Sequence, residues 1–389
     1  MRMNILDAFL SEAFQGLEEQ GLRRTLRVLD AIDGTRITIG GRDYQNFSSN
    51  DYLGLGSHPV LAAAMAEAAG RYGVGATASR LICGTTAEHA ALEEELAAAK
   101  GSEAALVFAT GMAAATGTIP ALQGKGDEII LDKLAHASLI DGARASEATL
   151  RVFPHNDLTK LESHLKWARK TYPSARVMIL TESVFSMDGD LAPLREIVEL
   201  KDRVGAILFL DEAHAVGVRG RGAQGLAGEL GLGDKVEIQM GTLGKALGVS
   251  GGYIAGSRIL IDFLINRARS FIFSTAPSPA VAAAARAALR IVQSEEGDRL
   301  RAKLRENLTL LATGLNLENP PSAIVPMILG SEKRALAEAA RLLEAGFFVP
   351  AIRYPTVPRN TARLRITVSA AHEPEQIRGL AAAMQNQSF

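Results

Sequence analysis

The sequence predicts an α/β protein built on a mainly parallel, seven-stranded sheet with helices on both faces. Short apolar runs alternate with helical stretches through the middle of the chain, which is the pattern of a parallel sheet covered on both sides. After Phe273 the runs give way to long helices, which indicates a smaller α+β C-terminal domain. The predicted strands are AALVFA (104–109), EIILD (128–132), LRVF (150–153), RVMILTE (176–182), AILFLD (206–211), EIQM (237–240) and GGYIAG (251–256).

Three segments are expected along the chain: an N-terminal arm over residues 1–50, a large domain over 51–277 and a small domain over 278–389. Residues 3–27 have the apolar spacing of an amphipathic helix, and two short strands follow. A helix is predicted from Pro59 to about Gly70. Another begins near Thr86 and stops at Gly101, because glycine ends helices.

The composition excludes several classes of protein. Lys and Arg number 42 against 43 Asp and Glu, without a block of like charge, which argues against binding to nucleic acid or a membrane surface. The one cysteine, Cys83, rules out an intramolecular disulfide and a cysteine metal cluster, and no metal is expected. No targeting pattern or membrane-length apolar run is present. We therefore expect a cytoplasmic protein.

The candidate catalytic residue is Lys245, in the glycine-rich segment GTLGKALG. A lysine nucleophile must be a neutral amine, so its pKa has to fall about three units from ~10.4. Glycines at 241, 244 and 248 would let a planar ligand approach the lysine closely. This arrangement suits a Schiff base, although the same residues in isolation also fit a solvated lysine in a mobile loop.

Polar groups follow several of the predicted strands. Asp211 ends the run AILFLD, at the strand end where parallel sheets bind ligands, although alone it could equally cap a helix. Gly111 begins a helix whose amides could hold a phosphate. His136, Ser186 and His214 follow their own strands. Together these groups predict a ligand site at one edge of the sheet.

The segment DEAH after an apolar strand also suggests the magnesium-binding strand of a P-loop ATPase. That hypothesis requires a G-x-x-x-x-G-K-[ST] motif. Lys125 is followed by Gly126, and Lys245 by Ala246, so neither lysine is followed by the hydroxyl that would bind magnesium. The ATPase is therefore disfavoured.

Segments over nearly the whole chain resemble the α-oxoamine synthases, which are pyridoxal-phosphate enzymes of the aspartate-aminotransferase fold, fold type I. The similar segments are NFSSNDYLGL, TAEHAALEEELA, HASLIDGA, TESVFSMDGDLAPL, DEAHAVGVRGRGAQG, GTLGKALGVSGGY, FIFSTAPSP and AIRYPTVPRNTARLRITVSAAHE. This resemblance implies a homodimeric transferase with pyridoxal phosphate as its cofactor.

The resemblance also implies roles for individual residues at the cofactor. Lys245 would carry it covalently, Asp211 would pair with the pyridine nitrogen, His214 would bond the ring oxygen and His136 would stack on the ring. The phosphate would be held by the backbone groups of Gly111 and Met112, by Thr242, and by Ser274 and Thr275 of the neighbouring subunit. Ser186 would also lie at the cofactor.

Family members join an amino acid to an acyl thioester, with loss of carbon dioxide and of the thiol carrier. Arg365 would bind the amino-acid carboxylate through its planar fork, and Asn50 would also contact substrate. AIRYPTVPRNTARLRITVSAAHE favours the biotin-pathway member, which joins L-alanine to a pimeloyl group on CoA or acyl-carrier protein. Its acyl chain would then meet Arg23, Arg353 and Thr356.

Three alternatives stay open within this class of enzyme. MGTLGKALG and SRLICGT are closer to members that join glycine to acetyl-CoA, and YPTVPR with RLRIT is also found in 5-aminolevulinate synthases. An aminotransferase on the same fold is the third.

Overall fold

The computed structural model describes residues 4–385, and the chain forms two compact units. The large unit is Asn50–Glu306, and the small unit combines Met1–Ser49 with Asn307–Phe389. Among the described residues, no helix has both the length and the apolar character needed to cross a membrane.

The large unit is organised around a seven-stranded sheet with the order β4-β10-β9-β8-β7-β5-β6. Strand β10 is antiparallel to both neighbours, and the other neighbouring strands are parallel. The predicted fold class and all seven predicted strands are therefore confirmed. The strands are β4 (Ala104–Phe108), β5 (Glu128–Asp132), β6 (Thr149–Phe153), β7 (Val177–Glu182), β8 (Ile207–Asp211), β9 (Ile238–Thr242) and β10 (Gly252–Gly256).

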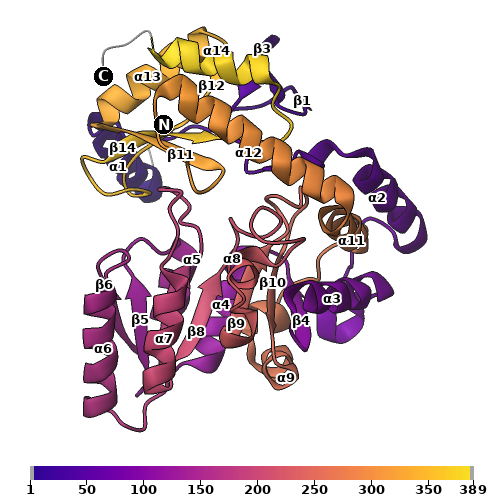
Figure 1. The fold of residues 1–389 in the computed structure, drawn as a ribbon, viewed down its shortest axis with the longest axis vertical. Coiled ribbons are helices and arrows are strands. Elements are labelled where there is room, and N and C mark those ends of the chain that lie inside the picture. The colour runs from indigo at the N-terminus through magenta and orange to yellow at the C-terminus, as the bar shows by residue number, and fades with distance from the viewer. Residues whose placement is uncertain (1–3, 386–389) are drawn as a thin grey trace. The chain divides into compact units, whose positions relative to one another are not determined.

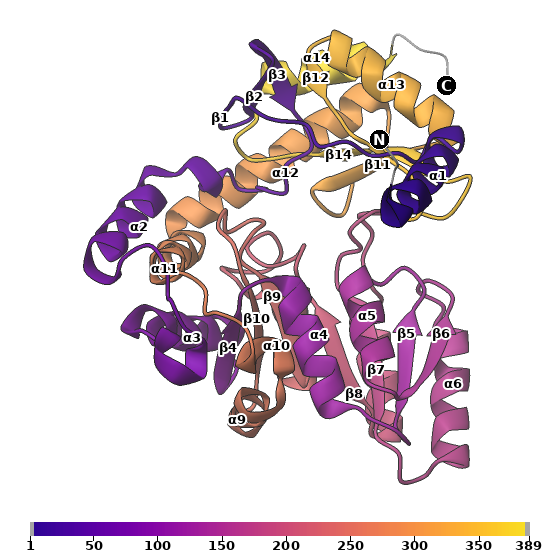
Figure 2. The same ribbon diagram turned by 180° about the vertical axis from the view of Figure 1, so that it is seen from behind.

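Helices cover both faces of this sheet, as Figures 1 and 2 show from opposite sides. Successive side chains of a strand alternate between faces, so Met178 and Leu180 join one core cluster while Val177 and Ile179 join another. The first cluster includes residues of α4 (Gly111–Leu122), α5 (Ala137–Ala145), α9 (Arg258–Arg267) and α10 (Arg269–Ile272). The second includes residues of α6 (Leu158–Thr171), α7 (Leu194–Val204) and α8 (Gly225–Glu229).

The other helices of the large unit pack beside the sheet. The predicted start near Thr86 and stop at Gly101 are confirmed, since Thr86 is the N-cap of α3 and Gly101 ends it in the left-handed region. Helix α11 packs against α2 and α3, where Ala68, Ala280 and Ala283 are buried together. These elements are η1 (Leu55–Ser57), α2 (Pro59–Tyr72), η2 (Arg80–Gly84), α3 (Ala87–Lys100), η3 (Gly233–Lys235), α11 (Pro279–Gln293) and the first part of α12 (Glu295–Leu315).

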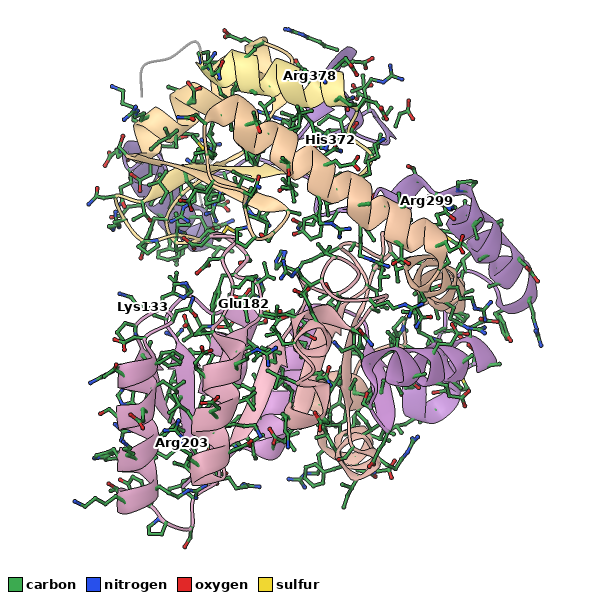
Figure 3. All side chains as sticks on the ribbon, in the orientation of Figure 1. Lys133, Glu182, Arg203, Arg299, His372 and Arg378 are labelled. Atoms are coloured by element: carbon green, nitrogen blue, oxygen red, sulfur yellow. The ribbon has the colours of Figure 1, made fainter. Side chains whose placement is uncertain are left out.

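The small unit contains two sheets, with the orders β1-β2-β3-β12 and β11-β14-β13. His372, labelled in Figure 3, stacks on Phe47 with ring centroids 4.1 Å apart. The elements are α1 (Ile5–Glu19), β1 (Ala31–Asp33), β2 (Arg36–Ile39), β3 (Arg42–Asn46), β11 (Ile324–Gly330), α13 (Glu332–Glu344), β12 (Phe347–Phe348), β13 (Ala351–Ile352), β14 (Ala362–Thr367) and α14 (Pro374–Gln385).

These units differ from the predicted domains in two places. Residues 278–306 belong to the large unit, because α11 buries its alanines against α2. The N-terminal strands share a sheet with β12, so the predicted arm and the C-terminal segment form one body. The predicted helix over 3–27 ends at Glu19, its first residue lies outside the described residues, and three strands follow it rather than two.

Candidate functional site

The predicted site residues of the large unit follow strands whose carboxyl ends meet at one edge of the sheet. Strands β5, β7 and β8 run parallel and end at Asp132, Glu182 and Asp211. Figure 3 shows Glu182 and Lys133 toward this edge and Arg203 toward the opposite one. The loops that carry His136, Ser186 and His214 therefore leave the sheet on the same side.

Lys245 lies in a tight loop between β9 and β10. The loop is closed by hydrogen bonds from the Gly248 N–H to the Lys245 carbonyl at 2.8 Å and from the Val249 N–H to the Leu243 carbonyl at 2.9 Å. Gly248 has φ +68°, and a Cβ there would lie 2.4 Å from the Gly56 nitrogen. A Cβ on Gly241 would lie 2.4 Å from the Tyr253 ring. These two glycines therefore make room for the protein's own packing, which corrects the expectation that they leave space for a ligand.

Charged groups around Lys245 act on one another. Asp211 is 4% exposed, and its Oδ1 accepts the Ala213 N–H at 2.9 Å. Desolvation lowers the pKa of His136, the Asp211 carboxylate raises it and the Lys245 ammonium lowers it again, with a net downward shift. The structure thus brings Lys245, Asp211 and His136 close enough for their charges to interact, and it favours a neutral imidazole at His136.

Three of the residues predicted to hold a phosphate, Gly111, Met112 and Thr242, lie together at the start of α4. Thr110 caps this helix by accepting the Ala113 N–H at 3.0 Å, and the amides of Gly111 and Met112 have no partner within the helix. A Cβ on Gly111 would lie 2.6 Å from Cγ2 of Thr242. The Thr242 hydroxyl is buried without a hydrogen-bond partner in the described chain. A buried orphan hydroxyl beside helix N-terminal amides is a donor set that fits a phosphate group.

His214 is held by a tyrosine that was not predicted from the sequence. The Tyr52 hydroxyl lies 2.5 Å from Nδ1 of His214 and donates to Oδ1 of Asn50 at 3.2 Å. Tyr52 and His214 are both buried. This contact orients the imidazole and brings the predicted residues Asn50 and His214 into one group. The sign of this contact in the sequence is the position of Tyr52 in the segment NFSSNDYLGL.

Glu182 is the second residue that sequence reasoning missed. It is 2% exposed and pairs in register with Asp211 on the neighbouring strand. Burial, followed by the Asp211 charge, raises the pKa of Glu182 well above its usual value, and this outweighs the opposing effects of Lys245 and of the backbone N–H groups of His136 and Ser186. Two adjacent buried carboxyls do not both ionise readily, so Glu182 is the neutral one.

We expect Glu182→Gln to retain turnover within about threefold, because glutamine keeps the oxygen that accepts the two backbone N–H groups. Glu182→Ala should lose more than tenfold, a loss of ~1.4 kcal/mol or more. Because the folded pKa is raised, the wild-type chain loses stability as pH rises above about 4.5, where the unfolded carboxyl ionises. The melting temperature of Glu182→Gln should therefore rise relative to that of wild type between pH 4.5 and 7. Equal losses of turnover in both variants would contradict a neutral carboxyl.

Ser274 and Thr275 follow α10, and the structure does not bring them to Lys245 by any contact it describes. The Ala276 N–H donates to the Ala78 carbonyl at 2.9 Å, and Thr275 forms an isolated bridge with Ser79. Thr275 is exposed. Their role across a subunit boundary stays a prediction.

The predicted substrate residues other than Asn50 lie in the small unit. Arg353 donates to the carbonyls of Gly21 and Arg23, and Thr356 accepts from the Arg24 guanidinium at 3.3 Å. Arg23, Arg24, Arg27 and Arg353 line one groove of about 660 Å³ with Glu18, which pairs with Arg23. Burial, and then the Arg24 charge, lowers the pKa of Arg353. The groove is therefore a cationic surface.

Arg365 is on strand β14 and does not line this groove. It is 6% exposed, and its guanidinium donates to the Thr367 hydroxyl at 3.0 Å. Arg365 is thus a buried arginine on the central strand of this sheet, between β11 and β13.

The P-loop alternative is wrong, because a P-loop lysine is followed by a helix. Lys245 leads into strand β10 rather than into a helix. Glu212 of the DEAH segment forms a buried ion pair with Lys100, and its Oε1 accepts the Ala227 N–H at 2.9 Å. It is held in place as a structural residue. Among residues 4–385, no group of His, Cys, Asp or Glu could hold a metal ion.

The parallel sheet, the lysine between β9 and β10 and the phosphate-type donors together define a pyridoxal-phosphate-dependent transferase of fold type I. A sequence profile of the family "Aminotransferase class I and II" matches residues 42–384. The chain belongs to this family, and within it to the α-oxoamine synthases.

Known relatives cover nearly the whole chain. An 8-amino-7-oxononanoate synthase of Geobacter sulfurreducens is 48% identical over 375 residues, with 95% of each chain covered. The enzyme of the same name from Anaeromyxobacter dehalogenans (strain 2CP-1) is 47% identical, over 97% of this chain and 94% of its own. A serine palmitoyltransferase from S. paucimobilis has a TM-score of 0.92 at 30% identity, covering 99% and 98% of the two chains.

Proposed function

We propose that the enzyme catalyses the decarboxylating condensation of L-alanine with a pimeloyl thioester to give 8-amino-7-oxononanoate, a step of biotin synthesis. The observation that carries the proposal is the group of Lys245, Asp211 and His136 at one sheet edge, in a chain 48% identical to a synthase of that name over 95% of both. The cationic groove of the small unit supports the choice of an acyl chain that ends in a carboxylate.

The cofactor supplies an electron sink for the carbanion formed at the amino-acid α carbon. Asp211 would hold a proton on the pyridine nitrogen through its buried carboxylate, which makes the ring a better sink. Thr242 and the amides of Gly111 and Met112 would bind the phosphate. His136, kept neutral by its lowered pKa, would stack on the ring without adding a second positive charge.

Lys245 would move the substrate proton. Its Nζ, as a free amine after substrate binds, would take the proton from the α carbon and return one to the product. His214, oriented by Tyr52, would bond the ring oxygen through the imidazole. Arg365 would hold the substrate carboxylate, since an arginine fork binds a carboxylate with two parallel hydrogen bonds.

The acyl chain is where the substrate choice would be made. A pimeloyl chain ends in a carboxylate, and burying that charge without a partner costs several kcal/mol, roughly 3–5. Arg23 and Arg353 would provide the partner, as neighbours in the cationic groove.

Arg353→Ala and Arg23→Ala should each raise the KM for pimeloyl thioester by about tenfold, a loss of ~1.4 kcal/mol typical of one charged hydrogen bond. The KM for a neutral acyl chain of equal length should change little. Arg378→Ala is the matched control, because Arg378 is an exposed arginine of the same unit, paired with Glu375 at 3.2 Å. Equal losses on the charged and neutral chains would remove charge recognition from the proposal.

A homodimer is part of the proposal. Helix α1 has no buried residue in the single chain, and Ile5, Leu6 and Phe9 are 93%, 62% and 65% exposed. Such an apolar face is typical of a subunit contact. Sedimentation velocity should show a dimer at working concentration, and a fully active monomer would contradict it.

Free-thiol release tests the reaction class. With pimeloyl-CoA and L-alanine the enzyme should release CoA and carbon dioxide in equal amounts. An aminotransferase would instead convert L-alanine and a 2-oxo acid without releasing thiol. Thiol release that requires no amino acid would also count against the condensation.

A further inference from the structure

A hydrogen-bonded cluster at the carboxyl edge of the sheet involves none of the residues assigned to the cofactor. His155, after β6, lies between two carboxylates, with Nδ1 3.1 Å from Oδ1 of Asp132 and Nε2 2.7 Å from Oδ2 of Asp190. Asp132 is fully buried at the end of β5, and Asp190 is in the loop after β7. The imidazole also meets the Phe185 ring edge-on, with centroids 4.3 Å apart. The end of β5 and the loops after β6 and β7 are thus joined at one side chain.

Asn156 also links the loop after β6 to the end of β5 and to the loop after β7 by hydrogen bonds. Its backbone N–H donates to Oδ2 of Asp132 at 2.9 Å, and its side-chain amide donates to Oδ2 of Asp190 at 3.1 Å and to the Leu191 carbonyl at 3.2 Å. Its φ of +55° lies in the left-handed region, which asparagine tolerates better than most residues. The backbone after β6 is therefore held in an uncommon conformation by these contacts.

The contacts require a charged imidazole. Both carboxylates can only accept, whereas a neutral imidazole carries a proton on one nitrogen alone. Burial lowers the pKa of His155, but the hydrogen bonds that its ring donates to Asp132 and Asp190, together with the charges of these carboxylates, raise it to about 10. These two carboxylates are the titratable groups that act on the ring. His155 is therefore a cation through the neutral range.

Each of the two aspartates is also hydrogen-bonded to a segment that leads into a cofactor residue. Oδ1 of Asp132 accepts the Leu134 N–H at 2.8 Å, two residues before His136. The Phe185 N–H donates to the Asp190 carbonyl at 3.0 Å, and Ser186 follows directly. We propose that Asp132, His155 and Asp190 form an ionic clamp that positions the His136 and Ser186 loops for the cofactor. This inference rests on the proposed function only in assigning His136 and Ser186 to the cofactor.

The same two strands offer a matched control at their opposite ends. Asp127 precedes β5 and Arg176 precedes β7, and they pair at 2.5 Å. Oδ1 of Asp127 also accepts the Arg176 N–H at 3.1 Å. This ion pair links β5 to β7 as the clamp does, but at the edge that carries no cofactor residue. Removing this ion pair should therefore lower stability without changing the cofactor site.

The experiment compares His155→Gln and Asp190→Asn with Arg176→Gln in the full chain. Pyridoxal phosphate affinity is measured by equilibrium dialysis, the bound cofactor by visible circular dichroism, and loop order by amide hydrogen exchange of the cofactor-free protein. The clamp variants should weaken cofactor binding about tenfold, change the dichroism band and speed exchange over 133–137 and 183–191. Asp190→Asn leaves the ring in place, so it tests the clamp if His155→Gln folds poorly.

Arg176→Gln should lower the melting temperature and leave those three readouts unchanged. The pH dependence gives a further test. Because the folded pKa of His155 is raised, its stabilisation is complete below about pH 6.5 and is lost toward pH 10, so the melting difference between wild type and His155→Gln should shrink over that range. Equal effects of clamp and control variants on affinity and exchange would overturn the proposal. These readouts need neither alanine nor thioester, so a wild type that binds the cofactor without making product would refute only the proposed reaction.

Discussion

Lys245→Ala is expected to abolish turnover, with a loss of at least ~10³-fold, because it removes both the covalent attachment and the amine that moves the α proton. The cofactor should still bind, held by the phosphate-type donors around Thr242, but borohydride should no longer fix it to the protein. In wild type, borohydride reduction and peptide mapping should place the cofactor on Lys245.

Lys133→Ala is the matched control for this variant. Lys133 is an exposed lysine in the loop before His136, and Figure 3 shows it toward the same edge of the sheet as Glu182. Its loss should leave turnover and labelling unchanged. A cofactor that maps to another lysine in wild type would refute the assignment of Lys245.

Asp211→Asn should have the second-largest effect. The cofactor should stay attached to Lys245, but turnover should fall by about 10²–10⁴-fold, since losing one partner of a buried charge pair costs ~3–5 kcal/mol. Asparagine keeps the size of the side chain and can still accept the Ala213 N–H, so the local loop should survive. Exchange of the α proton of alanine with solvent, followed by NMR, isolates the affected step. Unchanged exchange in a correctly folded variant would contradict a role for Asp211 at the pyridine nitrogen.

The elements that could be predicted are those with local causes. An apolar run that stops at a charged residue, such as the strand ending at Asp211, marks a buried strand and its ligand side at once. Thr86 and Gly101 define α3 because a cap acts within one turn of its helix. The parallel sheet and its helices follow from the repetition of such elements.

Pairings between distant residues could not be read from the chain. Phe347 and Phe348 join the N-terminal sheet beside Gln45 and Asn46, a partnership with no local signal. Tyr52 meets His214 across 162 positions of sequence. In the sequence, Glu182 is indistinguishable from a solvated carboxylate at the end of a strand. Only its register with Asp211 reveals two adjacent buried carboxyls. These long-range contacts also decide which residues position the site.

The most direct test of the proposed reaction is a competition in one mixture. Purified enzyme with pyridoxal phosphate receives equal amounts of glycine, L-alanine and L-serine together with pimeloyl-CoA and acetyl-CoA, and mass spectrometry identifies the first product. We expect 8-amino-7-oxononanoate as the main product, with the alanine carboxyl released as carbon dioxide. Faster formation of the glycine–acetyl product would contradict it and assign the enzyme to a different member of the family.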